Sequence, residues 1–259
     1  MKPYYSSHGI TIFLGDCLSI LGNLPKATAN LFLTDPPYGI DYQNHYTKAV
    51  HSKICNDTKG FTYTDWATQA YCLLKENTAL FAYTGWSVYG THYKNLSKAG
   101  FTLKEPLIIQ KRLSGTSDLY GTFQTNADWL LFAHKGRFKF HKTQLLKNKK
   151  AGTIPNKGRK PVPTYKTRMP SCWFGSEYPW STENPKVTTQ YRHPTIKTVE
   201  LMSWLIQLTT DTNDLVIDPF MGTGTTLVAA RQLNRRAIGI EIDKEHCKTT
   251  ISRLQALGT

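Results

Sequence analysis

The chain of 259 residues is long enough for one large α/β domain, with or without an inserted module. Its 32 Lys and Arg outnumber its 18 Asp and Glu, and the net charge of +14 favours a polyanionic partner, nucleic acid ahead of an anionic membrane surface. No apolar run approaches the roughly 20 residues that a membrane span requires, and we expect no signal peptide. The five cysteines form no CxxC pair, so we expect reduced thiols in a cytoplasmic protein.

Short apolar runs alternate with helix-like stretches at both ends of the chain. The N-terminal part predicts strands over 10–16, 29–35, 78–86, 105–111 and 127–136, and helices over 17–25, 61–77 and 88–99. The C-terminal part predicts strands over 213–220 and 235–243, and helices over 198–210, 225–234 and the last residues. This alternation is typical of a doubly wound, mostly parallel α/β sheet.

A change in composition separates the two parts. From Trp129 to Ser176 the chain contains no Asp or Glu, and it is rich in Lys, Arg, Pro and Gly with little periodicity. We therefore predict one catalytic domain built from residues 1–140 and 185–259, with a basic segment over 141–184 inserted between its halves.

The stretch LTDPPYGID, residues 33–41, follows the predicted strand over 29–35. Two prolines cannot continue a strand, so the chain is stiff where the strand ends. Asp-Pro is an ordinary turn signal, and a stiff turn is one interpretation. The other is a site for chemistry, because the turn places a rigid acid beside a tyrosine.

A second motif, LVIDPFMGTGTTLVAA, is followed by RRAIGIEID. The order is strand, glycine-rich turn, helix, strand and acid. Gly222 and Gly224 let the backbone approach a ligand, and Glu241 is placed to accept hydrogen bonds from ribose hydroxyls. A dinucleotide-binding fingerprint needs a third glycine after the turn, and this chain has Thr225 and Thr226 instead. The difference disfavours a nicotinamide-dependent enzyme.

Together the two motifs resemble the beta group of DNA amino-methyltransferases, which use S-adenosylmethionine (AdoMet) and carry a circular permutation of the Rossmann-like methyltransferase fold. TDPPYG, DPFMGTGTT and His193-Pro194-Thr195-Ile196-Lys197 carry the resemblance, which covers nearly the whole chain. Thr198 departs from the family's HPTxKP stretch. The resemblance implies a seven-stranded sheet with one antiparallel strand.

The resemblance also implies the catalytic residues Asp35, Pro36, Pro37 and Tyr38. An exocyclic amino nitrogen is a poor nucleophile, because its lone pair is delocalised into the ring. The Asp35 carboxylate and the Pro36 carbonyl are suited to accept its two N–H groups, and Tyr38 offers a stacking face. The base must be flipped out of the duplex first. No metal is expected, since His51 and Cys55 alone do not make a site.

By the same resemblance, the AdoMet site comprises residues from both ends of the chain. They are Asp16, Thr195, Lys197, Asp218, Phe220, Gly222, Gly224, Thr225 and Glu241. Thr195 and Lys197 are expected near the methionine carboxylate, and Asp16 near the adenine amino group. The alternative for Asp16 is a helix N-cap, and for Lys197 and His193 a solvated helix start.

The basic segment is the predicted DNA reader, where the family keeps its target-recognition region. Its phosphate-binding candidates are Lys147, Lys149, Lys150, Lys157, Arg159, Lys160, Lys166 and Arg168. Tyr165, Trp173 and Trp180 are placed to stack on bases or to pack the segment itself. A charge run is usually a solvated face, but this one lacks every acid.

The sequence thus predicts a site-specific methyltransferase acting on N6 of adenine in double-stranded DNA. DPPY favours adenine, with cytosine N4 as the alternative in the same class, followed by an RNA methyltransferase, an inactive DNA-binding module and a nicotinamide oxidoreductase. A separate restriction endonuclease is an expected partner unless the enzyme is solitary, and dimerisation, known in the family, stays open. No membrane partner is expected.

Overall fold

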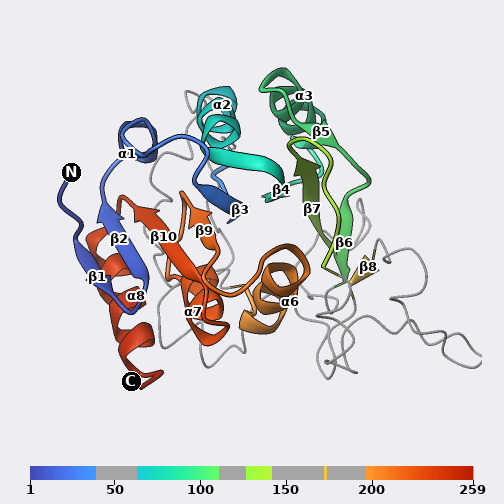
Figure 1. The fold of residues 1–259 in the computed structure, drawn as a ribbon. Helices are drawn as coiled ribbons and strands as arrows, with labels where there is room; N and C mark the ends of the chain where they lie inside the picture. The colour runs from blue at the N-terminus through green and yellow to red at the C-terminus, as the bar shows by residue number, and fades with distance from the viewer. Residues whose placement is uncertain (39–62, 111–126, 142–171, 174–196, 259) are drawn as a thin grey trace, which may run out of the picture.

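The predicted strands form one mixed sheet within the part of the chain that the computed structural model describes, residues 1–38, 63–110, 127–141, 172–173 and 197–258. This sheet has ten strands in the order β1-β2-β10-β9-β3-β4-β7-β6-β8, with β5 paired to β7 (Figure 1). The strands are β1 (Tyr5–Ser7), β2 (Ile10–Leu14), β3 (Ala29–Thr34), β4 (Leu74–Thr84), β5 (Thr102–Leu103), β6 (Leu107–Gln110), β7 (Ala127–His134), β8 (Cys172–Trp173), β9 (Leu215–Asp218) and β10 (Arg236–Glu241).

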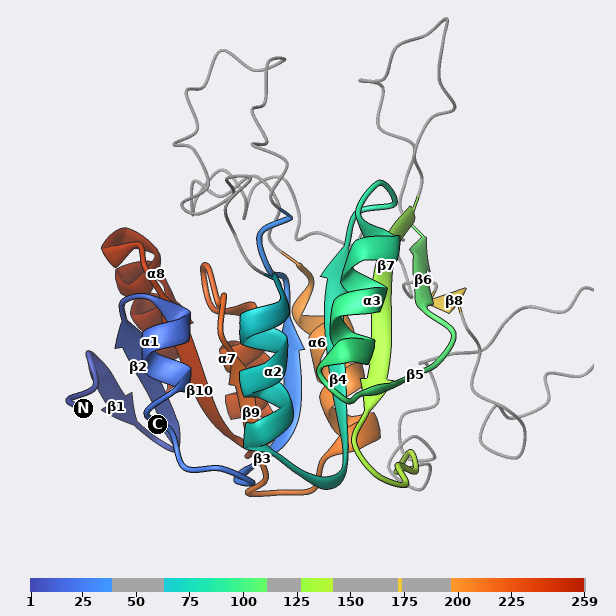
Figure 2. The same cartoon turned by 90° about the horizontal axis from the view of Figure 1, so that it is seen from above.

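The described helices cover both faces of the sheet, as Figure 2 shows. They are α1 (Cys17–Leu21), α2 (Tyr63–Leu73), α3 (Tyr89–Lys98), α6 (Val199–Thr209), α7 (Thr225–Gln232) and α8 (Lys244–Gln255). The apolar residues of α1, α2 and α3 pack in one core layer, and those of α6, α7 and α8 pack in the other. Alternate residues of a central strand face opposite layers: Leu31 and Leu33 face α6 and α7, and Phe32 faces α2.

The two ends of the chain meet at the centre of the sheet. Strand β9 from the C-terminal part pairs in parallel with β3 from the N-terminal part, with Leu31 opposite Val216 and Phe32 opposite Ile217. From β9 the chain continues through α7 to β10 on one side of this pair. From β3 it continues through α2 to β4 on the other side. In open α/β sheets, ligands bind outside the carboxyl ends of the strands at such a switch point.

The sheet contains the seven expected strands and the short additions β1, β5 and β8, which make up the ten. Among the seven, β7 alone runs antiparallel to its neighbours, pairing with β4 and β6. Strand β1 forms a hairpin with β2 that composition gave no reason to expect. The predicted doubly wound α/β fold is therefore confirmed, with extra edge strands.

One predicted boundary is wrong. The helix expected over 61–77 ends at Leu73, and Leu74 already belongs to β4, where it pairs with Ala29 of β3. Asn77 has a φ of 64°, a left-handed conformation that a continuous α-helix excludes. Leu74 is fully buried, so its apolar character reflects the strand ladder rather than a last helical turn.

Candidate active site

The two motifs meet where β3 and β9 end. The Thr34 hydroxyl donates a hydrogen bond of 2.7 Å to Oδ1 of Asp218, which also accepts the Phe220 N–H at 3.2 Å. Burial raises the pKa of the Asp218 carboxyl to about 6, against the lowering effect of hydrogen bonds from Thr34, Thr226 and the Phe220 N–H. Asp218, predicted as a cofactor residue, thus joins the ends of the two strands.

The DPPY stretch begins where β3 ends, at a cavity that Asp35 and Asp218 both line. Pro36 is buried, and the Tyr38 hydroxyl donates 2.9 Å to Oδ1 of Asp35. Burial and the neighbouring Asp35 carboxylate raise the pKa of Tyr38 well above its ordinary value, so the phenol stays protonated and remains a donor. The turn therefore orients the Asp35 carboxylate, and its predicted catalytic role stays a prediction.

Lys197 reaches Asp35 from the residues before α6. Its Nζ lies 3.1 Å from Oδ2 of Asp35 and 4.3 Å from the ring centroid of Tyr83 on β4. Burial lowers the pKa of Lys197, but the carboxylates of Asp35 and then Asp128 outweigh burial, and the net pKa is raised. Lys197 is therefore a charged, partly buried cation, and the solvated helix start is not its environment.

The glycine-rich turn brings the cofactor half together. Gly222 and Gly224 have φ values of 51° and 78°, in the left-handed region that favours glycine. Gly224 is also the N-cap of α7, and a Cβ added there would lie 2.2 Å from Cγ2 of Thr250 on α8. The turn is thus held against α8, and Thr225 and Thr226 at the start of α7 line a cavity beside it.

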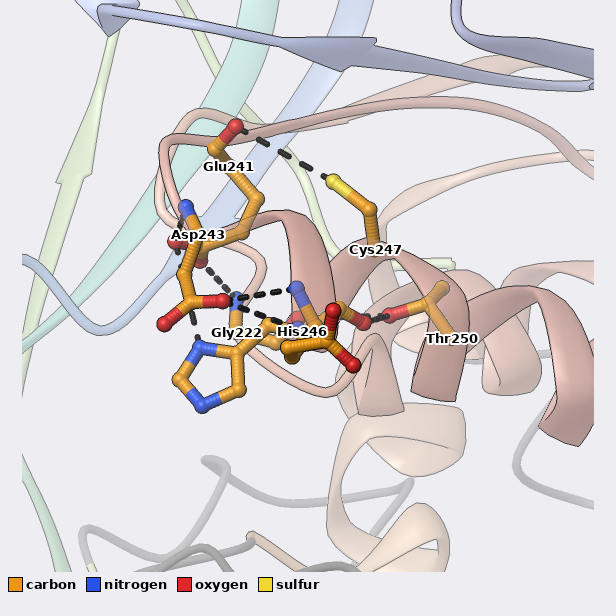
Figure 3. A network of polar contacts seen from close by, with 7 residues as sticks. Gly222, Glu241, Asp243, His246, Cys247 and Thr250 are labelled. Atoms are coloured by element: carbon orange, nitrogen blue, oxygen red, sulfur yellow. Dashed lines mark hydrogen bonds and ion pairs between the residues drawn. The ribbon is translucent and has the colours of Figure 1, made fainter. Parts of the chain in front are cut away.

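Glu241 closes this turn at the tip of β10 (Figure 3). Its Oε2 accepts the Gly222 N–H at 2.9 Å, and its Oε1 accepts the Asp243 N–H at 2.8 Å. His246 Nδ1 lies 3.9 Å from Oε1. Burial lowers the pKa of His246, but its hydrogen bond to Glu241 and the charges of Glu241 and Asp243 give a net rise. Oε2, with one partner, keeps a lone pair for a ribose hydroxyl.

Thr225 lies at the start of α7 with its hydroxyl 3.1 Å from a guanidinium nitrogen of Arg253. Arg253 is buried and also donates 2.8 Å to the Thr223 carbonyl. Arg253 therefore holds the glycine-rich turn and the start of α7 together. No sequence motif indicated this role.

Asp16 caps α1, accepting the Ser19 N–H at 3.0 Å, so the helix-cap interpretation is confirmed. Its strand is where the permuted fold requires it, since Leu14 of β2 lies opposite Glu241 of β10 and the Gly15 N–H donates 2.9 Å to the Glu241 carbonyl. Asp16 is exposed, and its predicted contact with the cofactor adenine stays a prediction.

One cavity connects the two motifs. Its lining includes Thr34, Asp35, Tyr83, Lys197, Phe220, Gly222 and Thr225. Tyr83 and Thr34 were not predicted, since both end apolar runs that indicate buried strands and nothing more. Asp35 and the glycine turn thus line the same cavity.

Trp86 is a further unpredicted feature of this edge. It is 75% exposed and follows Gly85, whose added Cβ would lie 3.6 Å from the Tyr38 ring. The Val88 N–H donates 3.1 Å to the Gly85 carbonyl, which fixes the turn. An exposed indole on a fixed turn next to Tyr38 is suited to stacking against a nucleic-acid base.

Several predicted residues lie outside the described residues. They are Thr195, His193, His51 and Cys55, and the basic candidates Lys147, Lys149, Lys150, Lys157, Arg159, Lys160, Lys166 and Arg168. Within the described ranges, no three His, Cys, Asp or Glu side chains gather as a metal site. No helix among the residues that the structure describes has the length and apolar character to cross a bilayer.

Comparison with solved structures defines the class of fold. The M1.HpyAVI–SAM complex superposes with a TM-score of 0.62 at 22% identity, covering 95% of this chain and 99% of that one. PvuII DNA methyltransferase, described as cytosine-N4-specific, gives a TM-score of 0.71 at 19% identity, covering 97% and 88%. The fold is that of the AdoMet-dependent methyltransferases.

The family is shown by sequence. The N6/N4 DNA methylase model matches residues 29–252, and the chain belongs to this family. The type II methyltransferase M2.MboI of Moraxella bovis is 28% identical over 265 residues, which cover 95% of this chain and 88% of that relative. The chain is thus a DNA methyltransferase, and S-adenosylmethionine is its cofactor.

Proposed function

We propose that this DNA methyltransferase transfers a methyl group from AdoMet to the N6 amino group of an adenine flipped out of duplex DNA. The observation that carries the proposal is the Asp35 carboxylate, fixed by the DPPY turn in the same cavity as the glycine-rich turn. Cytosine N4 is the alternative, and the acidic first residue of DPPY is what favours adenine.

The residues present fit the cofactor. Gly222 and Gly224 provide a turn without side chains, Phe220 lies beside it in the cavity lining, and Glu241 has acceptor capacity for ribose hydroxyls. When bound, AdoMet supplies an electrophilic methyl group on a positively charged sulfur. We assign the ribose to Glu241 and the methionine end to the region of Lys197 and Thr195.

The protein's own contribution is to activate and hold the amino nitrogen. Asp35 accepts one N–H and the Pro36 carbonyl accepts the other, which favours a pyramidal nitrogen with an available lone pair. The Tyr38 ring stacks on the flipped base, while its hydroxyl keeps the Asp35 carboxylate oriented. Positioning and electrostatics carry the catalysis.

DNA binding is assigned to the basic segment over 141–184, whose Lys and Arg neutralise phosphates. A separate restriction endonuclease acting on the same site is the proposed partner where the enzyme is not solitary, and a cytoplasmic location is proposed.

The test is incubation of the purified protein with labelled AdoMet and mixed-sequence duplex DNA, followed by nucleoside mass spectrometry. N6-methyladenine is the expected product, and N4-methylcytosine in its place would overturn the adenine assignment. Asp35→Ala should abolish turnover while AdoMet binding is retained. Asp211→Asn, at an exposed residue beside His141 at the amino edge of the sheet, is the matched control.

A further inference from the structure

The catalytic carboxylate has both of its oxygens engaged in the structure. Oδ1 of Asp35 accepts the Tyr38 hydroxyl at 2.9 Å, and Oδ2 lies 3.1 Å from Nζ of Lys197. Because the Lys197 ammonium offsets the negative charge of Asp35, this ion pair weakens the carboxylate as an acceptor for an incoming amino group. Tyr38 belongs to the same turn and moves with Asp35, so Lys197 is the partner that exchange would remove.

Lys197 is held firmly in this position. Its side chain is only 13% exposed, and its ammonium lies over the Tyr83 ring as well as against Asp35. A cation over an aromatic face and beside a carboxylate is stabilised by both. Among the described residues that line the cavity, Lys197 is the one cation.

The cofactor brings a second carboxylate into this cavity. Its methionine end carries a carboxylate whose burial requires a positively charged partner. The glycine turn lines one part of the cavity, with Glu241 bonded to its Gly222 N–H, and Lys197 lines another part. We place the nucleoside at the glycine turn and the amino-acid portion near Lys197.

We propose that Lys197 is a shared cation that passes from Asp35 to the cofactor carboxylate, so that cofactor binding releases Asp35 for the target base. The inference rests on the proposed function, since it takes Asp35 as the acceptor for the amino group. In the free protein Asp35 holds the ammonium, and the cofactor carboxylate competes for it on binding. With cofactor bound, Asp35 has lost this cation and is a stronger acceptor for the N–H of the base.

This exchange makes the two sites thermodynamically coupled. Any change that loosens Lys197 from Asp35 strengthens binding of a carboxylate-bearing cofactor, and by linkage the cofactor favours engagement of Asp35 by the base. Lys197 thereby acts as a positioning residue that favours cofactor before base.

The experiment measures binding without DNA or turnover. S-adenosylhomocysteine has the cofactor's carboxylate but no sulfonium charge, and 5′-methylthioadenosine lacks the amino-acid portion. Asp35→Asn should tighten S-adenosylhomocysteine binding about fivefold by calorimetry, since a partly buried ion pair is weakened, and should leave 5′-methylthioadenosine binding unchanged. Equal effects on both ligands, or tightening of neither, would overturn the exchange.

A double-mutant cycle separates exchange from simple repulsion between two carboxylates. In a Lys197→Met background, Asp35→Asn should no longer tighten S-adenosylhomocysteine, because there is no ammonium to release. Tightening that persists would mean direct repulsion and would refute the shared cation. Asp211→Asn serves as the charge control, and thermal melting checks that each variant is folded.

The result of the binding experiments does not depend on which base the enzyme methylates. If turnover gives no methylated adenine but the binding cycle behaves as expected, the proposed function fails and the exchange stands. If adenine is methylated and the cycle shows no coupling, the proposed function stands and the exchange fails.

Discussion

Gly224→Ala tests whether the glycine-rich turn needs glycine for backbone and packing reasons together. Residue 224 has a φ of 78°, and an added Cβ would lie 2.2 Å from Cγ2 and 2.7 Å from Oγ1 of Thr250. Thr250 is fully buried, and its hydroxyl donates to carbonyl oxygens of Gly222 and His246, so it has little freedom to move. The left-handed conformation costs about 1–2 kcal/mol for alanine. Overpacking adds about 1–3 kcal/mol.

We therefore expect Gly224→Ala to lower the free energy of unfolding by about 2–5 kcal/mol, measured by urea denaturation. Thr250→Ala removes the two nearest atoms and leaves only its Cβ, at 2.9 Å, so Gly224→Ala should cost less in that background, with coupling of about 1–3 kcal/mol. The backbone cost should persist. Additive losses across the cycle, or a Gly224→Ala variant as stable as the wild type, would refute the packing argument.

Three further predictions concern pH, base contact and DNA charge. The raised pKa of Asp218 means that the folded state holds its proton more tightly than the unfolded state, so this group's stabilisation is present below pH 4 and is lost as pH rises through about 6. Asp218→Asn should gain about 2–3 kcal/mol relative to wild type between pH 4 and pH 7 in denaturation series, and a constant difference would contradict this. Trp86→Ala should weaken mixed-sequence duplex binding about tenfold, while Trp86→Phe retains most of it; equal losses would exclude stacking. Replacing Lys149 and Lys150 with Ala should lower the slope of log K against log salt by about 2, and an unchanged slope would remove the segment as the DNA reader.

Much of the fold was predictable because buried parallel strands carry continuous apolar runs. LVID of β9 is buried at every position, and the acid or the glycine after each run marks the edge where the site forms. The boundary at 73–74 was not predictable, because CLL fits a helix and a strand equally well until the partner strand is known. Pairing of Leu74 with Ala29 decides it, and that is a long-range contact.

The site divides in the same way. Local sequence motifs were enough to identify five candidate site residues: Asp35, Tyr38, Gly222, Gly224 and Glu241. The interactions that orient them come from residues whose own neighbourhoods look ordinary. Tyr83 lies in an apolar strand and Arg253 in the last helix, and only the folded chain shows that one lies beneath the Lys197 ammonium and the other supports the glycine turn.

The bond between Thr34 and Asp218 shows why permuted chain order leaves the chemistry intact. The two residues are 184 positions apart, but they end adjacent parallel strands, and a 2.7 Å hydrogen bond sets the spacing of the two motifs. Asp35 follows Thr34 directly, and the glycine turn follows Asp218, so this contact ties the start of the DPPY stretch to the start of the glycine-rich turn. The geometry of the proposed methyl transfer therefore depends on the β3–β9 pairing and not on the order in which the chain supplies those two strands.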